Sequence, residues 1–222
     1  MKNGIEIYKK LVPVKTCDAL IRLMEENMSK SYPGTVSVNK TSSIKKTIDI
    51  DLKNIASEDL IADIVKALKK AAINYFKEYK IYPSEHKDEL LAFSSAKFHD
   101  VFIKSLFSWD QSSLHIKKYN VGDYFNWHID RGNSSWLNYS RELVFQIYLN
   151  EGCKGGETQF KFQDVSIKPS VGAVLVFPAG FTHKHRGAKV TQGTKYIYNC
   201  CLMQNNPALK NKLSNQKNWM KI

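Results

Sequence analysis

Cysteine is scarce in this sequence, and the few cysteines present do not form a metal-binding pattern. The chain contains four, Cys17, Cys153, Cys200 and Cys201, with no CxxC pair and no spacing suited to a zinc site. On a strand, the adjacent Cys200 and Cys201 would point to opposite faces, which disfavours a disulfide between them. We interpret all four as reduced packing residues.

The sequence also lacks a long apolar run. No stretch approaches the length that spans a bilayer, and the first residues, MKNGIEIYKKLVPV, contain neither the sustained apolar segment nor the small-residue cleavage site of a signal peptide. Hydrophobic residues nevertheless make up 43% of the chain, which is enough for a folded core. The sequence therefore predicts a soluble, cytoplasmic protein with no membrane partner, built as a single domain over residues 1–222.

Negative charge is in short supply. Lysine and arginine number 33 against 21 aspartates and glutamates, which gives a formal net charge of +12. Such a surplus would suit an acidic partner, whether nucleic acid, an acidic protein or an anionic small molecule. The lysines are spread along the chain and into a basic polar tail at 204–222 rather than gathered in one stripe. We therefore interpret most of this charge as a solvated surface.

The first half of the chain is predicted to contain the helices. An alternating stretch over 6–14 predicts a strand, and Thr16 can then cap a helix. A second helix starts at Ser57, because two acidic residues follow it and the apolar residues keep helical spacing as far as Tyr79. Residues 83–110 keep neither period, so we expect irregular or short helical structure there.

From residue 114 onward the pattern changes to short strands separated by glycine and proline. The expected strands are 114–119, 124–129, 142–149, 157–162, 165–167, 173–177, 183–190 and 195–203. Many short strands with this punctuation indicate a sandwich or barrel. The predicted fold class is α+β, with a helix-rich support region at 1–110 followed by a barrel at 114–203.

The most informative stretch is LHIKKYNVGDYFNWHID, residues 114–130. His128 and Asp130 lie two residues apart, so on a strand both side chains point to the same face. With a third imidazole from a distant strand they would form a 2-His-1-carboxylate facial triad, which holds Fe(II) and leaves open positions for oxygen chemistry. Both His183 and His185 in FPAGFTHKHRG are candidates for that third ligand, and their spacing alone does not choose between them.

Several stretches, taken in order, resemble the catalytic core of the Fe(II)/2-oxoglutarate-dependent dioxygenases, in particular the prolyl 4-hydroxylase-like branch. They are YNVGDYFNWHIDR, RELVFQIYLN, GGETQF, GAVLVFPAGFTHKHRG and GTKYI, within residues 114–202. The resemblance implies a double-stranded β-helix of the jelly-roll or cupin-like type, braced by the N-terminal helices. It also implies Fe(II), 2-oxoglutarate and O2, with ascorbate as a further candidate cofactor.

The resemblance further implies roles for individual residues. In the family pattern the ligand histidine is followed by a glycine two residues later and by the co-substrate lysine ten residues later, which fits His185 with Gly187 and Lys195. His183 would then lie at the rim and orient a ligand or the substrate. Lys195 would pair with the distal carboxylate of 2-oxoglutarate, and Tyr119 would donate its hydroxyl to the same group. Plain core packing is the alternative for Tyr119.

Two weaker candidates, Gln146 and Thr194, would lie at the rim of this co-substrate pocket. For the substrate, the candidates are Arg131, Arg141 and Trp136, because both arginines flank a polar segment that is typical of a lid.

The side chain between the two ligands, Trp127, should face away from the metal and pack in the core.

The resemblance implies a hydroxylase that releases succinate and CO2, with a prolyl residue in a peptide or protein as the leading substrate. The alternatives are the same chemistry on a free amino acid, another small metabolite or nucleic acid, and a non-catalytic jelly-roll binding module. Nucleic-acid demethylases of this superfamily carry arginines after the third ligand, where this chain has only Arg186. A binding module would not need His128, Asp130, His185 and Lys195 together.

Overall fold

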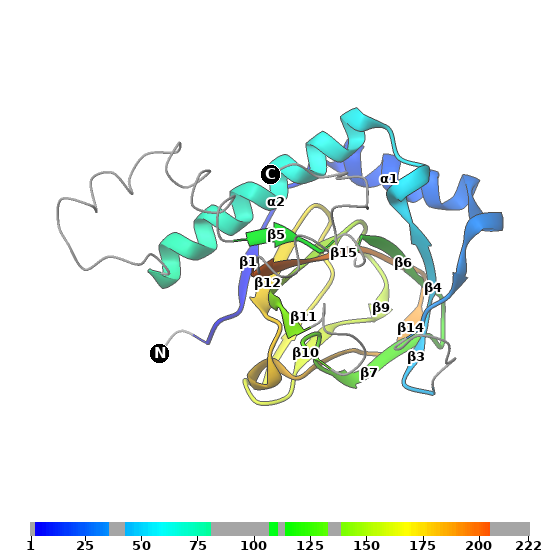
Figure 1. Cartoon of the computed structure of the whole chain (residues 1–222). Coiled ribbons are helices and arrows are strands. Elements are labelled where there is room, and N and C mark those ends of the chain that lie inside the picture. Colours follow the sequence, from blue (N-terminus) through cyan, green and yellow to red (C-terminus); the bar gives the residue numbers. More distant parts are fainter. Residues whose placement is uncertain (1–2, 36–42, 81–106, 111–113, 133–138, 205–222) are drawn as a thin grey trace.

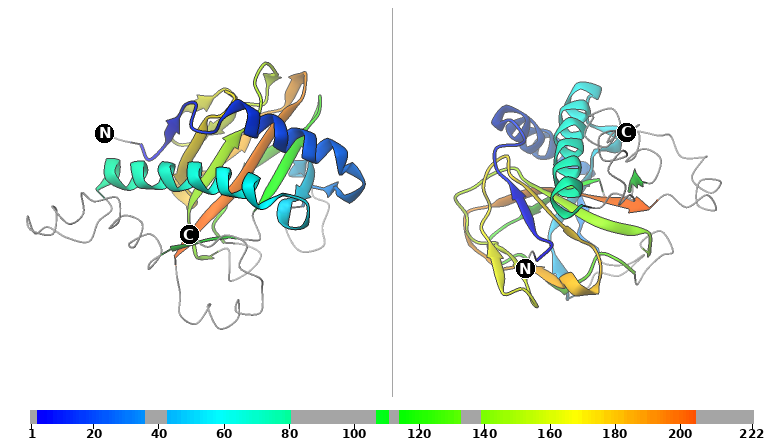
Figure 2. Two further views of the ribbon diagram at one scale, coloured as in Figure 1. Left: turned by 90° about the horizontal axis from the view of Figure 1, so that it is seen from above. Right: turned by 90° about the vertical axis from the view of Figure 1, so that its left-hand side faces the viewer.

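The computed structural model describes residues 3–35, 43–80, 107–110, 114–132 and 139–204. Its strands enclose a barrel, and both helices lie along one side of it (Figure 1). Seen from above, the helices run across the outer face of the larger sheet (Figure 2). The predicted α+β class, with a double-stranded β-helix braced by N-terminal helices, is confirmed.

The larger sheet has eight strands in the order β1-β12-β8-β15-β6-β4-β2, with β5 paired to β15. Its strands are antiparallel neighbours. They are β1 (Glu6–Tyr8), β2 (Tyr32–Pro33), β4 (Ile48–Asp51), β5 (Phe107–Trp109), β6 (His115–Tyr119), β8 (Arg141–Tyr148), β12 (Val174–Pro178) and β15 (Lys195–Gln204).

The smaller sheet has five strands in the order β11-β10-β13-β7-β3, and β14 pairs with β9 in a separate ribbon. These strands are β3 (Lys45–Lys46), β7 (Tyr124–His128), β9 (Lys154–Gly155), β10 (Thr158–Phe160), β11 (Val165–Ile167), β13 (His185–Gly187) and β14 (Val190–Gln192). The two sheets face each other across the barrel, so the inner side chains of both meet in its interior (Figure 1).

Helix α2 (Glu58–Tyr79) begins where the sequence predicts. The Ser57 hydroxyl accepts a hydrogen bond from the Leu60 amide at 3.4 Å, and two acidic residues in the first turn favour the positive end of the helix dipole. Its buried face, which includes Leu68 and Phe76, packs against the larger sheet. Neither described helix is long and apolar enough to cross a membrane.

Helix α1 (Val14–Glu26) begins before the position that the sequence predicts. The expected strand over 6–14 stops at Tyr8, because Lys10 adopts a left-handed backbone conformation with φ of 54° and turns the chain. Thr16 is not the cap: it is buried inside the helix, and its hydroxyl donates to Asp63 of α2 at 3.0 Å. Thr16 therefore joins the two helices instead of starting one.

Short 3₁₀ helices complete the described elements, at Met28–Lys30, Leu52–Asn54 and Phe181–His183. The last of these corrects the predicted strand at 183–190. That stretch is divided because the chain changes partners: β13 pairs with β7 and β10, whereas β14 pairs with β9. Most of the stretch 83–110 lies outside the described residues, but its end forms β5.

Two apolar clusters lie on opposite faces of the larger sheet. One fills the space between that sheet and the helices, and the other lies inside the barrel. Strand β15 serves both, since Tyr198, Cys200 and Leu202 belong to the helix-side cluster while Ile197 and Cys201 belong to the inner one. All four cysteines are free thiols, three of them fully buried, as the sequence predicts.

Candidate active site

The structure brings together three potential metal ligands from two neighbouring strands of the smaller sheet. His128 ends β7, Asp130 follows two residues later, and His185 opens β13 directly opposite His128 in the strand register. Their ligand atoms all lie within 4.8 Å of one another, and within the described ranges this is the one group of three such residues that could hold a metal ion.

Hydrogen bonds fix both imidazoles in the orientation that a metal requires. Nδ1 of His128 lies 2.7 Å from the Asn126 carbonyl oxygen, and Nδ1 of His185 lies 3.0 Å from the His183 carbonyl oxygen. A carbonyl only accepts, so each Nδ1 carries the proton and each Nε2 keeps its lone pair. Burial lowers the pKa of His128 to about 3 and lowers that of His185 as well, so both rings are neutral at pH 7.

Asp130 completes the set of candidate ligands with a carboxylate oxygen that has no hydrogen-bond partner. Its Oδ2 is buried and accepts no hydrogen bond, and His185 Nε2 lies 3.2 Å away without donating to it. Burial alone would raise the pKa of Asp130, but the two histidines and Arg141 outweigh it and lower the pKa below its usual value. Two neutral imidazoles and one carboxylate are a donor set that fits divalent iron.

Aromatic rings surround the three ligands. Phe125 stacks on His128 with ring centroids 3.5 Å apart, and Phe177 meets His185 edge-on at 4.6 Å. Phe160 lies 5.8 Å from His185 on another side. These rings restrict the ligand side chains and keep water from their inner faces.

The second histidine of the pair, His183, does not point to this centre. It lies in the 3₁₀ turn and not on a strand, so the expectation that His183 and His185 face the same way is wrong. Both of its nitrogens are engaged, Nδ1 with the Thr182 hydroxyl at 2.9 Å and Nε2 with the Asn3 carbonyl at 2.8 Å. His183 therefore ties the N-terminal segment to the barrel.

A buried cation lies deeper in the barrel. Lys195 is 1% exposed, and its ammonium donates to the Gly156 carbonyl at 2.6 Å. The Tyr119 ring, opposite Lys195 in the register of β6 and β15, lies 5.0 Å from the ammonium. Burial lowers the pKa of Lys195 to about 8, although Cys153 and Glu157 act against this. The site would therefore hold an unneutralised cation at pH 7 until an anion binds.

Two side chains near this cation were missed by the sequence analysis. The Tyr148 hydroxyl donates to Thr158 at 2.8 Å, and the Tyr148 ring lies 5.8 Å from the Lys195 ammonium. The amide of Gln146, a predicted rim residue, also donates to Thr158 at 2.8 Å. Because side chains alternate between the two faces of a strand, Tyr148 lies on the same face of β8 as Gln146, and this spacing could have identified it. The other rim candidate, Thr194, is half-buried, and its carbonyl accepts from Asn150 at 2.7 Å.

Both arginines predicted to meet substrate have acidic partners in the fold. Arg131 forms an ion pair with Glu142 and donates to the Tyr139 carbonyl at 3.1 Å. Arg141 binds the buried Asp110 at 2.6 Å, and its Nη1 donates to the backbone carbonyl of Asp130 at 3.2 Å. Arg141 thus holds the loop that carries a potential metal ligand.

The remaining aromatic predictions have mixed outcomes. Trp136 lies outside the described residues. Trp127 is partly exposed and not a core residue, which corrects the prediction, and the Arg186 guanidinium lies 4.7 Å from its ring centre. Both described α-helices lie on the side of the larger sheet, so among the described elements no helix covers the outer face of the smaller sheet, where Trp127 reaches the surface (Figure 1).

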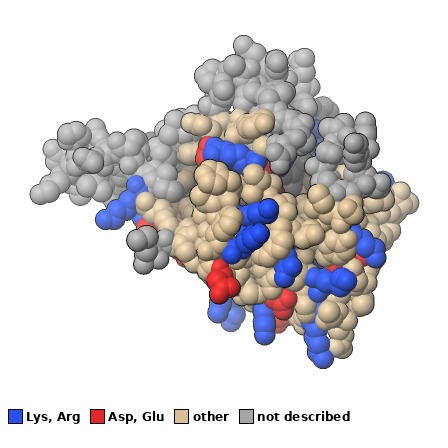
Figure 3. Space-filling model, turned by 90° about the horizontal axis from the view of Figure 1, so that it is seen from below, with Lys and Arg blue, Asp and Glu red and all other residues tan. Residues whose placement is uncertain are grey.

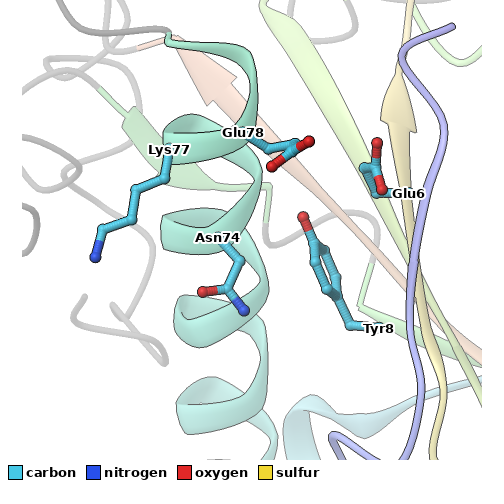
Figure 4. Close-up of a pocket in the computed structure, with 5 residues that line it drawn as sticks. All are labelled: Glu6, Tyr8, Asn74, Lys77 and Glu78. Atoms are coloured by element: carbon cyan, nitrogen blue, oxygen red, sulfur yellow. The ribbon is translucent and has the colours of Figure 1, made fainter. Parts of the chain in front are cut away.

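A separate pocket of about 340 Å³ opens between β1 and α2. Its lining consists of Glu6, Tyr8, Asn74, Lys77 and Glu78 (Figure 4). Ile7, between Glu6 and Tyr8 on β1, packs toward the barrel interior, so the pocket lies on the opposite face of the sheet from the three ligands. It is not part of the candidate metal centre.

The surface charge is distributed in patches with neutral residues between them. On the face seen from below, Lys and Arg side chains are separated by uncharged atoms and a few acidic groups (Figure 3). On this face, the picture agrees with a solvated basic surface more than with a continuous stripe.

The fold and the three ligands define a double-stranded β-helix protein of the metal-dependent oxygenase type. Residues 114–202 match the family model of the 2OG-Fe(II) oxygenase superfamily, which confirms the resemblance stated from the sequence. The cofactors of this superfamily are Fe(II), 2-oxoglutarate and O2, and the His128, Asp130 and His185 side chains of this chain fit an iron ion. None of the curated protein sequences matches this chain.

Solved structures with the same fold include three prolyl hydroxylases. A viral collagen prolyl hydroxylase from Paramecium bursaria Chlorella virus-1, in complex with 2OG, has a TM-score of 0.59 at 17% identity over 90% of this chain and 95% of its own. A Pseudomonas putida prolyl-4-hydroxylase has a TM-score of 0.61 at 15% identity, covering 92% and 95%. A Trichoplax adhaerens prolyl hydroxylase in complex with a hypoxia-inducible-factor peptide has a TM-score of 0.64 at 13% identity, covering 97% and 89%.

Proposed function

We propose that this protein is an Fe(II)- and 2-oxoglutarate-dependent hydroxylase of prolyl residues in a peptide or protein. His128, Asp130 and His185 hold the iron, and Lys195 with Tyr119 holds 2-oxoglutarate. The observation that carries the proposal is the convergence of three ligand atoms within 4.8 Å, one of them a buried carboxylate oxygen without a hydrogen bond. An unsatisfied buried oxygen beside two free Nε2 atoms is accounted for by a bound cation.

When bound, iron and 2-oxoglutarate supply the oxidising chemistry, in which O2 converts 2-oxoglutarate to succinate and CO2 and a substrate C–H to C–OH. The protein residues orient and enclose the reactants. Arg141 fixes the Asp130 loop through its backbone carbonyl, and Phe125 holds the plane of His128. Such support restricts the ligands to one geometry.

Lys195 is suited to anchor the distal carboxylate of 2-oxoglutarate. Its ammonium is fully buried and has a carbonyl oxygen as its hydrogen-bond partner, so a carboxylate would neutralise a charge that the fold leaves uncompensated. Tyr119 lies directly across from it on β6. The Tyr148–Thr158–Gln146 cluster forms a polar wall on β8 and β10.

The choice of a peptide substrate rests on the similar structures. One of them was solved with a peptide fragment bound, and others are named as hydroxylases of collagen or prolyl residues. In this chain, Arg131 would contact the peptide, and Trp136, which lies outside the described residues, stays a candidate from the sequence. Arg131 is partly exposed, so it can exchange Glu142 for a substrate group.

The test is an anaerobic titration of the metal-free protein with Fe(II) and then 2-oxoglutarate. A weak visible charge-transfer band is expected when the ketoacid chelates iron. His185→Ala should abolish the band, whereas His183→Ala is the matched control and should keep it, since both His183 nitrogens bind other groups. A wild-type protein that binds neither iron nor 2-oxoglutarate would contradict the proposal and favour a binding module.

A further inference from the structure

Lys117 is a second cation on the inner face of the barrel, and the proposed function does not use it. It lies on β6 two residues before Tyr119, so both side chains point to the same side of the strand. Its neighbour Lys118 points the opposite way and forms an ion pair with Glu25 of α1 at 2.8 Å. Lys117 is therefore on the side of the sheet that faces the candidate metal centre.

The ammonium of Lys117 lies close to the metal ligands. It is 6.0 Å from the centre of the Phe125 ring, and that ring stacks on His128 at 3.5 Å. The charge of Lys117 also lowers the pKa of Lys195, after the larger effect of burial. A cation in this position, beside the ring that packs on a candidate metal ligand, is placed to attract an anion.

Within the described residues Lys117 forms no close ion pair, although its charge interacts with the Asp130 carboxylate at longer range. Asp49 lies opposite it in the register of β4 and β6, but both Asp49 oxygens are taken, Oδ2 by Lys45 at 2.5 Å and Oδ1 by the Thr47 hydroxyl at 2.6 Å. Across the part of the chain that the structure describes, the Lys117 ammonium forms no ion pair and no hydrogen bond. Lys117 is partly exposed, so a ligand from solvent can reach it.

With Fe(II) and 2-oxoglutarate bound, the formal charges of the neighbouring groups can be paired with one another. Lys45 and Asp49 cancel each other. The iron dication and Lys195 are balanced by Asp130 together with the two carboxylates of 2-oxoglutarate. Among the described side chains Lys117 then remains as a positive charge without a close ion pair, 6.0 Å from the centre of the Phe125 ring that stacks on His128, whereas the further anion Glu157 acts on Lys195.

We propose that Lys117 binds a carboxylate of the substrate, so that the enzyme selects acidic substrates. This inference rests on the proposed function, because it assigns the substrate side of the same site. The carboxylate has two possible sources: an aspartate or glutamate side chain next to the target proline in a peptide, or the α-carboxylate of a free amino acid. Both sources present the same chemical group, a carboxylate, to the Lys117 ammonium.

The experiment compares three probes in equilibrium binding to protein loaded with Zn(II) and 2-oxoglutarate, where no turnover occurs. The probes are a proline-containing peptide with glutamate beside the proline, its glutamine twin, and free L-proline. Wild type should bind the glutamate peptide about tenfold more tightly than the twin if the carboxylate comes from a peptide side chain. Tight binding of L-proline with neither peptide bound would assign the carboxylate to a free amino acid.

The variants are Lys117→Gln and Lys117→Glu, with Lys118→Gln as the matched control on the outer face of the same strand. Lys117→Gln should reduce the preference for the carboxylate probe over the glutamine peptide to within about twofold, because the ion pair between the lysine and the carboxylate can no longer form. Lys117→Glu should reverse it, and Lys118→Gln should leave it unchanged. The same ranking is expected for hydroxylated product, detected by mass, with the iron enzyme.

Three results would overturn the proposal. The first is a wild-type protein that does not distinguish the carboxylate probes from the glutamine peptide, and the second is a preference that survives in Lys117→Gln. The third is a loss of 2-oxoglutarate affinity in Lys117→Gln as large as in Lys195→Ala, which would assign Lys117 to the co-substrate. Failure of the proposed function is distinct, since it appears as a missing charge-transfer band in wild type before any substrate is added.

Discussion

The two faces of the eight-stranded sheet differ in the kind of side chain that they bury. On β15, the helix-facing residues Tyr198, Cys200 and Leu202 are all below 1% exposed, and all three lie in the apolar cluster beneath α1 and α2. Toward the barrel, the same strand presents Lys195 and Asn199, both buried and polar. Burying polar groups costs stability, so the inner face keeps them for binding while the outer face supplies the packing. The comparison predicts that substitutions on the two faces will separate activity from stability.

The largest effect is expected from the inner face, at the ligands themselves. Asp130→Ala or His128→Ala should reduce iron-dependent turnover to background, because a facial triad that loses a ligand no longer holds iron in place. The thermal unfolding midpoint of the metal-free variants should stay near that of wild type, since the change removes only an unsatisfied buried oxygen or one ring of a stacked pair. Retained turnover would remove the residue from the ligand set.

On the outer face, Leu202→Ala should lower the free energy of unfolding by about 2–5 kcal/mol, because it leaves a cavity beneath the helices. Denaturant titration measures the loss, and Val121→Ala, at a residue 60% exposed, is the control with a change within about 0.5 kcal/mol. The folded fraction should bind iron as wild type does. A weakened iron site in Leu202→Ala would mean that the two faces are not independent.

Lys195→Ala should raise the 2-oxoglutarate requirement by about 30-fold or more, equivalent to roughly 2 kcal/mol for a lost buried charge pair. Iron affinity without 2-oxoglutarate should not change. The dependence of initial rate on 2-oxoglutarate concentration gives the comparison, and Lys118→Ala on the outer side of β6 is the control. An unchanged requirement would exclude Lys195 as the anchor.

The affinity for 2-oxoglutarate should also depend on pH through Lys195. Burial lowers its pKa to about 8, so the ammonium is protonated below pH 8 and loses its proton as the pH rises above it. An anion binds the protonated form, so affinity should be level below about pH 7, fall by about half at pH 8, and fall roughly fivefold more between pH 8 and pH 9. Lys195→Arg, whose guanidinium stays charged, should show no such fall. The charge-transfer band recorded across this range provides the measurement.

The smallest effect should come from the solvent side of the outer face. Glu25→Gln weakens the ion pair with Lys118 and the hydrogen bond from the Tyr196 hydroxyl. Glu25 is 41% exposed, so solvent screens the pair and the free energy of unfolding should fall by less than about 1 kcal/mol. A larger fall in the free energy of unfolding, measured by denaturant titration, would show that the contacts of Glu25 stabilise the protein more than their exposure suggests.

Much of the fold follows from local sequence signals. Helix α2 starts at its serine cap, and most of the strands after residue 114 lie within two residues of their predicted bounds, since glycine, proline and alternation are local features. The errors arose where tertiary pairing overrides local pattern. The stretch 183–190 reads as one strand, yet it divides because its two halves join different sheets. Thr16 reads as a cap, yet Asp63 of the neighbouring helix binds it.

For the site, the sequence by itself determined which residues could serve: the His128–Asp130 spacing, two histidines near 185 and a lysine at 195 are fixed by chain order alone. The family pattern favours His185, and the tertiary structure adds the physical reason: the Thr182 hydroxyl and the Asn3 carbonyl, the latter almost the whole chain away, bind both nitrogens of His183. The tertiary structure also decided that Arg141 supports Asp130, and that Lys117 faces inward while Lys118 faces outward. These outcomes depend on which partner each strand face meets, and that information is spread over residues far apart in the sequence.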